Sequence, residues 1–367
     1  MFEAFAPAFG EIDAEGLLRC LRREGEPSRV YHMELFLDGE VKAELCRRFP
    51  ILEGLDRGDP HFHQQAEIRI QRFLGYDYLR CGAVVSWPRG GPQSTVGVVD
   101  DLGGLPRAGG RGFVDEHKGY LSTWEEFEQM QWPDVSQADT SALEWYERNL
   151  PDDMCLLGTS GAHFYEHLSW LMGYETLAYA LFEDRALVKA ISDRLIEMAE
   201  AQAKLELQFS RVRGIWGSDD MGFRSGLLIG PDDMREYILP GHRLVAKLAH
   251  EAGRVYLLHS CGQLELIMKD LVEDVRIDAR HSFEETAEPV VEVKRRWGDR
   301  VSLIGGIDMD FLCRANEEQV RRRVRETLDV CQPGGGYCLG TGNSVANYVP
   351  VDNYLAMLDE GRRYGRG

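Results

Sequence analysis

The chain has 367 residues, which is long enough for two average domains or for one large barrel. Hydrophobic residues make up 44% of the sequence, enough to form a packed core, and this excludes a disordered chain. The 42 Lys and Arg against 61 Asp and Glu give a net charge of −19, which argues against nucleic acids and anionic membrane surfaces as partners.

Short β-branched apolar runs alternate along the chain with longer segments of helical periodicity, a pattern typical of a parallel α/β fold. We predict eight strands, at Val30–Phe36, Tyr78–Ser86, Met154–Thr159, Gly214–Ser218, Arg254–His259, Asp274–His281, Val301–Ile307 and Gly336–Thr341. The periodicity predicts helices at Gly39–Arg48, Phe62–Leu74, Tyr165–Leu181, Leu187–Arg211, Pro231–Ala252, Gln263–Val272, Pro289–Trp297 and Glu317–Cys331. Eight such units predict a TIM (β/α)8 barrel. A doubly wound sheet competes, but no GxGxxG or P-loop fingerprint supports it.

The connection between the second and third predicted strands is a large insertion. Residues 87–153 include the glycine-rich stretch VGVVDDLGGLPRAGGRGFVDEHKGY, which is typical of a β-hairpin. In a barrel this connection lies on the carboxyl-end face, where active sites are built, so the hairpin is either a lid or a surface excursion. We find no internal repeat, and we expect a single domain over residues 1–367.

The sequence gives no sign of a membrane span or a signal peptide. No window approaches 18 consecutive apolar residues, and the first residues, MFEAFAPAFGEIDAEG, carry acidic side chains instead of a basic region. We therefore expect a cytoplasmic protein. The eight cysteines are spread along the chain without a CxxC pair, which indicates reduced thiols, a few of them available as metal ligands.

The stretch His259-Ser260-Cys261-Gly262 closes an apolar run and precedes a helical segment. An imidazole and a thiolate at a strand end are ligands that suit zinc. The alternative is a loop in which Gly262 relieves a tight turn and Cys261 is only packed. A zinc site needs further ligands, and the candidates from other strand ends are Glu34, Asp219 and Cys338, although Cys338 comes early in its strand, below the rim.

Carboxylates follow two other strands. Asp219 and Asp220 come directly after Gly214–Ser218, where they could bind a cation, accept hydrogen bonds from a substrate, or act as a general base. Asp308 ends the run VSLIGGI and has the same candidate roles. The structural alternative is that each caps the turn that follows it.

Further polar residues stand at strand ends. His281 closes an apolar stretch and could contact substrate or serve as an acid, and a packed histidine is the alternative. We include His163, Tyr165 and Glu34 as candidate substrate-binding residues at the same end of the barrel.

Several of these segments together resemble the uroporphyrinogen decarboxylase superfamily. The matching stretches cover nearly the whole chain, and they are RVYHMELFLDGE, SDDMGFRSGLLIGPDDMREYILP, HSCG, LIGGIDMDFL and GGGYCLGTGNSVANYVPVDNYLAML. The resemblance implies a TIM barrel. The superfamily includes true uroporphyrinogen decarboxylases and corrinoid-dependent methyltransferases, so the resemblance specifies fold more closely than function.

The chain departs from both family patterns. True decarboxylases carry FMRQAGRY near their start, with arginines that bind the substrate carboxylates, whereas Glu34 stands here in place of the first arginine. The methyltransferase branch carries a zinc site of pattern HxC…C, whose first two positions match His259 and Cys261. Its third position aligns best with Asn343, a poor zinc ligand.

The resemblance favours a methyltransferase-like enzyme that moves a one-carbon group to a small acceptor, with a thiol activated by zinc as one candidate. It implies a corrinoid on a separate protein, since no corrinoid-binding domain is recognisable here. Decarboxylation of uroporphyrinogen or another acidic substrate is the alternative, with Asp219 or Asp220 contacting pyrrole NH groups. A non-catalytic barrel that binds a small ligand is the third interpretation. The resemblance also implies a homodimer.

Overall fold

The computed structural model describes residues 12–87, 95–99, 105, 111–114 and 119–365. Within these residues eight parallel strands form one sheet in the order β1-β12-β11-β10-β9-β6-β5-β2. All eight predicted strands are present, and their bounds are β1 Tyr31–His32, β2 Tyr78–Arg80, β5 Cys155–Gly158, β6 Val212–Ser218, β9 Val255–His259, β10 Ala279–His281, β11 Ser302–Ile304 and β12 Tyr337–Leu339. The predicted α/β barrel fold is confirmed.

Side chains join the two ends of this strand order. The Tyr78 hydroxyl, on β2, donates to the Glu34 carbonyl at 2.5 Å and accepts from the Glu34 N–H at 2.8 Å. Arg80, also on β2, donates to the Leu35 carbonyl at 2.9 Å. Glu34 and Leu35 follow β1, so these bonds bring β1 next to β2 and curl the sheet into a barrel.

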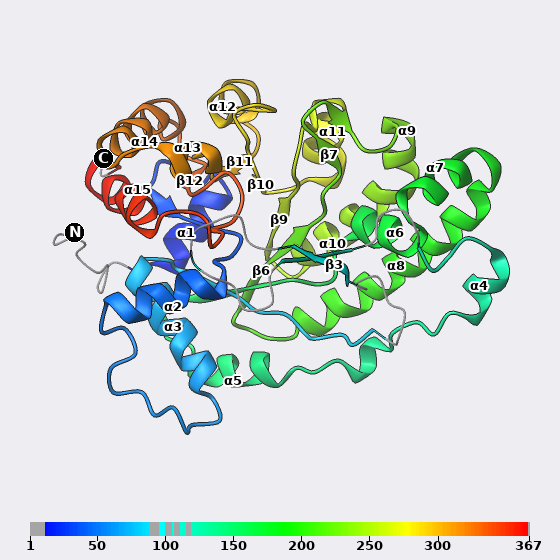
Figure 1. Ribbon diagram of the computed structural model, residues 1–367, viewed down its shortest axis with the longest axis horizontal. Coiled ribbons are helices and arrows are strands. Elements are labelled where there is room, and N and C mark those ends of the chain that lie inside the picture. The colour runs from blue at the N-terminus through cyan, green and yellow to red at the C-terminus, as the bar shows by residue number, and fades with distance from the viewer. Residues whose placement is uncertain (1–11, 88–94, 100–104, 106–110, 115–118, 366–367) are drawn as a thin grey trace.

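Helices surround the sheet, with α13, α14 and α15 on one side of the strands and α6, α7 and α8 on the other (Figure 1). In α8, buried residues recur every three or four positions, as expected for a helix with one face on a core. The helices are α1 Ala14–Leu21, α2 Gly39–Arg48, α3 Phe62–Leu74, α4 Trp124–Gln129, α5 Ser141–Asn149, α6 Phe164–Met172, α7 Tyr174–Glu183, α8 Arg185–Glu206, α9 Pro231–Asp233, α10 Leu239–Glu251, α11 Glu265–Asp270, α12 Val290–Trp297, α13 Met309–Arg314, α14 Glu317–Cys331 and α15 Val351–Tyr364. Short 3-10 or π-helical turns are η1 Val135–Gln137, η2 Met234–Ile238 and η3 Leu271–Val275.

Several predicted bounds were wrong for identifiable reasons. The predicted helix Tyr165–Leu181 is two helices, because Gly173 between them has φ +76°. The strand predicted over Asp274–His281 starts only at Ala279, because η3 continues to Val275 and Arg276 ends it with φ +65°. Helices α1, α4, α5, α13 and α15 were not predicted. In α15 every residue from Asn353 to Gly361 is buried, so no amphipathic stripe marks this part of the helix.

The insertion after β2 contains two antiparallel strands, β3 Thr95–Val99 and β4 Arg111–Val114, where a hairpin was expected. Between them, the Leu105 N–H donates to the Asn347 carbonyl at 2.8 Å, and the Asn347 amide donates back to the Leu105 carbonyl at 2.8 Å. Asn347 lies in the loop after β12, so this insertion reaches the carboxyl end of the barrel.

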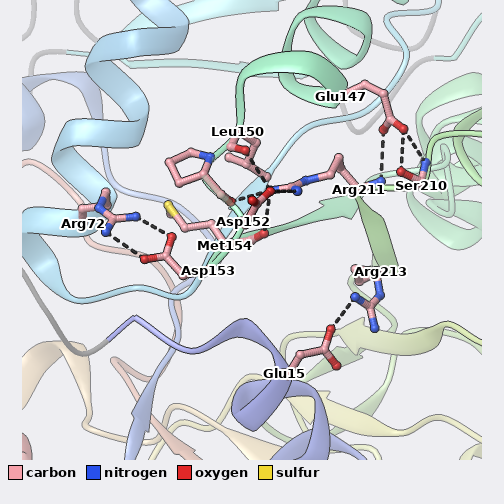
Figure 2. Close-up of polar contacts among 11 residues, drawn as sticks. Glu15, Arg72, Glu147, Leu150, Asp152, Asp153, Met154, Ser210, Arg211 and Arg213 are labelled. Atoms are coloured by element: carbon pink, nitrogen blue, oxygen red, sulfur yellow. Dashed lines mark hydrogen bonds and ion pairs between the residues drawn. The ribbon is translucent and has the colours of Figure 1, made fainter.

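The opposite end of the barrel is held by ion pairs and hydrogen bonds, shown in Figure 2. Arg211, just before β6, donates to the Leu150 carbonyl and to Asp152, just before β5. Glu147 accepts from the backbone N–H groups of Ser210 and Arg211. These contacts fasten the amino ends of two adjacent strands, away from the candidate site. Among the described helices, none has the length and apolar character to cross a membrane.

Candidate metal centre

Three side chains of metal-binding type converge at the carboxyl ends of β6 and β9. Asp220, His259 and Cys261 each place a ligand atom within 4.8 Å of the other two. Among the described residues, this is the one group of three or more His, Cys, Asp or Glu side chains whose ligand atoms lie close enough together to hold a metal ion. The His259 side chain is 4% exposed and that of Asp220 is 40% exposed, so the group is anchored in the barrel and open on one side.

The spacing of these atoms fits a tetrahedral ion. His259 Nε2 lies 3.2 Å from Asp220 Oδ1 and 3.7 Å from Cys261 Sγ. With ordinary zinc bond lengths, tetrahedral ligands stand about 3.3 Å apart for an N–O pair and about 3.5 Å for an N–S pair. Oxygen, imidazole nitrogen and thiolate form a known type of zinc ligand set, and three protein ligands leave a position for substrate.

His281 supports the His259 ring from the next strand. The Nδ1 atoms of the two rings are 2.7 Å apart, and the residues are paired in the register of β9 and β10. Burial, together with the charges of His259 and Arg80, lowers the pKa of His281 well below its ordinary value, so the ring is neutral. A neutral His281 can accept the Nδ1 proton of His259, which leaves Nε2 of His259 as the ligand atom.

The backbone around Cys261 fixes where its thiol lies. The Cys261 N–H donates to Asp220 Oδ1 at 2.9 Å. Gly262 has φ +78°, and a Cβ there would stand 2.2 Å from the Gly222 carbonyl carbon. Gly222 belongs to β7 (Gly222–Phe223), which pairs with β8 (Gly226–Leu227), so only glycine lets this small hairpin pack on the HSCG loop. The suggestion that Gly262 relieves a tight turn is therefore correct, and it is compatible with a metal site.

Burial and the neighbouring groups shift the pKa values of Cys261 and Asp220 in opposite directions. Burial raises the pKa of the Cys261 thiol, and the neighbouring Asp220 carboxylate raises it further. Burial alone would raise the pKa of Asp220 as well, but the His259 ring and the Cys261 N–H stabilise the carboxylate and lower its pKa to about 2. A positive ion between these groups would favour the thiolate, which the protein groups alone do not.

The other proposed third ligands are engaged elsewhere. The Asp219 carboxylate accepts from the N–H groups of Tyr165 and Glu166, at 3.0 and 2.9 Å, and lies 2.9 Å from His242 Nε2. Glu34 accepts from the Thr341 N–H and hydroxyl, at 2.7 and 2.6 Å. Cys338 is buried within β12. None of these three side chains belongs to the ligand group, whose third member is Asp220, expected from the sequence as a catalytic carboxylate.

A cavity of about 920 Å³ adjoins the ligand group. Asn343 connects the two, because it lines the cavity and its Nδ2 lies 3.2 Å from Cys261 Sγ. Glu284 and Asp308 line the same cavity. Asp308 also caps α13, accepting from the Phe311 N–H at 3.0 Å, which confirms the structural role expected for it, and its catalytic role stays a prediction.

The two residues predicted near α6 are not members of the ligand group. His163 precedes the helix, and its Nδ1 is 2.9 Å from Glu166 Oε2. The Tyr165 ring is 1% exposed and stacks on Tyr174 at 6.3 Å between centroids. Because its ring is covered, Tyr165 could act on substrate binding only by positioning α6.

Sequence reasoning missed Arg280, which contacts the HSCG loop through the Gly262 carbonyl. It is fully buried on β10, pairs with Glu288 Oε2 at 2.7 Å and donates to the Gly262 carbonyl at 3.4 Å. The signal that could have found it was a charged residue inside an otherwise apolar strand, directly before His281. A fully buried charged side chain is normally paired with an opposite charge, and it contributes to a neighbouring site or to the specificity of the fold.

The fold and the ligand group together define a TIM-barrel protein that carries a candidate metal centre at the carboxyl ends of its strands. The model of the uroporphyrinogen decarboxylase (URO-D) family matches residues 116–364, and the chain belongs to this family. The superfamily resemblance inferred from the sequence is thereby confirmed.

Individual relatives have different activities. The chain is 27% identical over 189 residues to methylated-thiol–coenzyme M methyltransferase of Methanosarcina mazei, covering 51% of this chain and 48% of the relative. It is 24% identical over 242 residues to uroporphyrinogen decarboxylase of Thioalkalivibrio sulfidiphilus, covering 62% of this chain and 64% of the relative. These alignments span less than two thirds of either relative. The solved structure of a methyltransferase from Methanosarcina mazei superposes with a TM-score of 0.68 at 17% identity, over 95% of this chain and 98% of that one, which shows a shared fold.

Proposed function

We propose that this protein is a methyltransferase that passes a methyl group from a corrinoid, held by a separate protein, to a small thiol acceptor. The observation that carries the proposal is the convergence of Asp220, His259 and Cys261 at the carboxyl end of the barrel. Relatives named as methyltransferases within the same family support it. The corrinoid protein and a homodimeric assembly stay predictions.

The three residues would hold one zinc ion, which would supply the positive charge that favours ionisation of the acceptor thiol at neutral pH. His281 would keep the His259 ring in its ligand orientation. Asn343, beside Cys261, and Asp308 would line the route to the reacting atoms through the adjoining cavity. The acceptor thiol would release its proton to solvent, and its sulfur would take the methyl group, so that the electron pair of the broken carbon–cobalt bond would stay with the donor.

The proposal is tested with methylcobalamin as the donor and a panel of neutral and anionic small thiols as acceptors. We expect zinc-loaded protein to form the methylated thiol and cob(I)alamin in equal amounts. Cys261→Ser and Asp220→Ala should lose this activity, whereas Cys46→Ala, which removes a partly exposed thiol of α2, should keep it. Transfer that is unchanged in both site variants would overturn the proposal.

Decarboxylation of uroporphyrinogen is an outcome of the same experiments. Both carboxylate oxygens of Asp219 are occupied by backbone N–H groups, so contacts to pyrrole NH groups would fall to Asp220. Coproporphyrinogen formed from uroporphyrinogen by the metal-free protein would favour the decarboxylase interpretation over ours. Absence of metal binding and of both reactions would favour a barrel that only binds a ligand.

A further inference from the structure

Asn343 stands in the loop after β12, where its side chain contacts the sulfur of Cys261. We propose that Asn343 is a positioning residue of the metal centre, whose amide N–H holds the Cys261 sulfur in place by a hydrogen bond and draws negative charge from that sulfur once a metal is bound. This inference rests on the proposed function and adds a residue outside the ligand group that sets the properties of the bound ion.

The contact between the amide and the sulfur is direct. Asn343 Nδ2 lies 3.2 Å from Cys261 Sγ, closer than His259 Nε2 at 3.7 Å or the Ser282 hydroxyl at 4.0 Å. Among the described residues, the Asn343 side chain has no other hydrogen-bond partner. A cysteine that binds a metal has lost its proton and can only accept hydrogen bonds. The Asn343 amide supplies the donor, and because an amide does not ionise, it does so without adding a charge.

Glu34 fixes the backbone that leads to Asn343. Its buried carboxyl group accepts from the Thr341 N–H at 2.7 Å and from the Thr341 hydroxyl at 2.6 Å. The backbone of Glu34 is held in turn by the Tyr78 hydroxyl, which bonds to both its N–H and its carbonyl. Glu34 therefore anchors the chain two residues before Asn343, which gives it a role although it is not a member of the ligand group.

The loop after β10 joins the loop after β12 to the HSCG loop. The Phe283 N–H donates to the Gly342 carbonyl at 3.0 Å, and the Ser282 N–H donates to the Ser260 carbonyl at 3.3 Å. The Gly342 N–H donates to the Ile307 carbonyl at 2.7 Å, and a Cβ on Gly342 would stand 2.4 Å from the Phe283 carbonyl oxygen. The backbone next to the amide and the backbone next to the sulfur are therefore held by one segment, so the fold sets the distance between the two groups.

The charges of the ligand group favour a hydrogen-bond donor here over another anion. A divalent ion bound by the Asp220 carboxylate, the Cys261 thiolate and a neutral His259 gives a site without net charge. A third anionic ligand would make the site negative, beside a cavity that the carboxylates of Glu284 and Asp308 already line. A hydrogen bond to the sulfur acts in the other direction, because it reduces the charge that the sulfur donates, so the ion keeps more positive charge to act on an acceptor thiol.

Cobalt(II) in place of zinc makes the sulfur visible, because a bond between Co²⁺ and a thiolate gives a charge-transfer absorption band. The metal-free protein is titrated with Co²⁺, and Cys261→Ser identifies the band by removing it. We expect the band to move to longer wavelength in Asn343→Leu, which has nearly the same size and no donor, because the hydrogen bond no longer stabilises the sulfur electrons. Asn343→Ala should move the band in the same direction. Chelator competition should show that the affinity for Co²⁺ falls by about tenfold in both variants.

Ser344→Ala is the matched control, because Ser344 is the next residue and lines the same cavity without a hydrogen bond to Cys261. Its Co²⁺ band should match that of wild type. A band that stays in place in Asn343→Leu and Asn343→Ala, or that moves equally in Ser344→Ala, would overturn the assignment of Asn343 and leave the metal centre standing. Wild-type protein without a sulfur–cobalt band would overturn the metal centre and this inference with it. A band that moves as expected, in a protein that methylates no thiol, would support the role of Asn343 and refute the proposed function.

Discussion

The Nδ1 atoms of His259 and His281 meet at 2.7 Å across paired positions of two adjacent parallel strands. One of two such atoms must carry the proton and the other must accept it. A neutral His281 can take the accepting role, which would place the proton on Nδ1 of His259 and leave its Nε2 facing Asp220 and Cys261. In the proposed metal centre the two histidines would act as one unit, in which His281 positions the His259 ring and does not need to touch substrate.

Replacing His281 should weaken metal binding without removing it. His281→Ala leaves His259 free to rotate or change tautomer, and we expect zinc affinity to fall by about 10–100-fold. Competition with a coloured chelator measures this affinity. His63→Ala, which removes an exposed histidine of α3, should leave it unchanged. An unaltered affinity in His281→Ala would show that the contact does not orient the ligand.

Substitutions of the adjacent carboxylates Asp219 and Asp220 should lower the free energy of unfolding by very different amounts. Asp219 is fully buried and satisfies two N–H groups at the start of α6 as well as His242, so Asp219→Ala should lower the free energy of unfolding by about 2–4 kcal/mol. Asp220→Ala should cost far less, because its side chain is 40% exposed. Urea denaturation of the metal-free proteins tests this, and equal losses would contradict the division of roles.

Gly262→Ala should damage the site through the backbone. The new Cβ would clash with the Gly222 carbonyl carbon, which would push β7 and β8 away from Cys261. Gly253→Ala is a matched control, since Gly253 has φ +71° and no atom lies within 4 Å of the place that its Cβ would take. Both variants should lose about 1 kcal/mol from the left-handed backbone conformation, but only Gly262→Ala should lose zinc as well. Full zinc content in Gly262→Ala would show that the loop tolerates the displacement.

Glu34 should make stability depend on pH in an unusual direction. Burial raises its pKa to about 8, although two hydrogen bonds from Thr341 oppose the rise. Because the folded pKa lies above the ordinary value of 4.5, the contribution of Glu34 to stability is complete below that value and is lost as the pH rises through about 8. Glu34→Gln, which cannot ionise, should therefore gain stability relative to wild type between about pH 5 and pH 9.

Urea midpoints of wild type and Glu34→Gln across this range give the measurement. Glu318→Gln, an exposed change on α14, should follow wild type at every pH. A difference between wild type and Glu34→Gln that stays constant with pH would show that Glu34 titrates normally.

The sequence predicted the barrel well because each strand is a short apolar run, and the order of these runs leaves few topologies. It also identified His259 and Cys261, because both stand at the end of one strand. The sequence did not show which carboxylate joins these two residues in the candidate ligand group. Asp219 and Asp220 are equivalent in the sequence, and only the path of the chain after β6 turns Asp219 towards α6 and Asp220 towards Cys261. Asn343, aligned with the third ligand of the methyltransferases, does lie beside Cys261, but as a hydrogen-bond donor.

The measurement that tests the central claim most directly is the metal content of the protein purified without chelators. Wild type and Glu34→Gln should each contain close to one zinc per chain. Asp220→Ala, His259→Ala and Cys261→Ser should contain little or none while keeping a folded circular dichroism spectrum. Wild-type protein that binds no zinc even when zinc is supplied, or variants that keep a full complement, would contradict a metal centre built from these three residues.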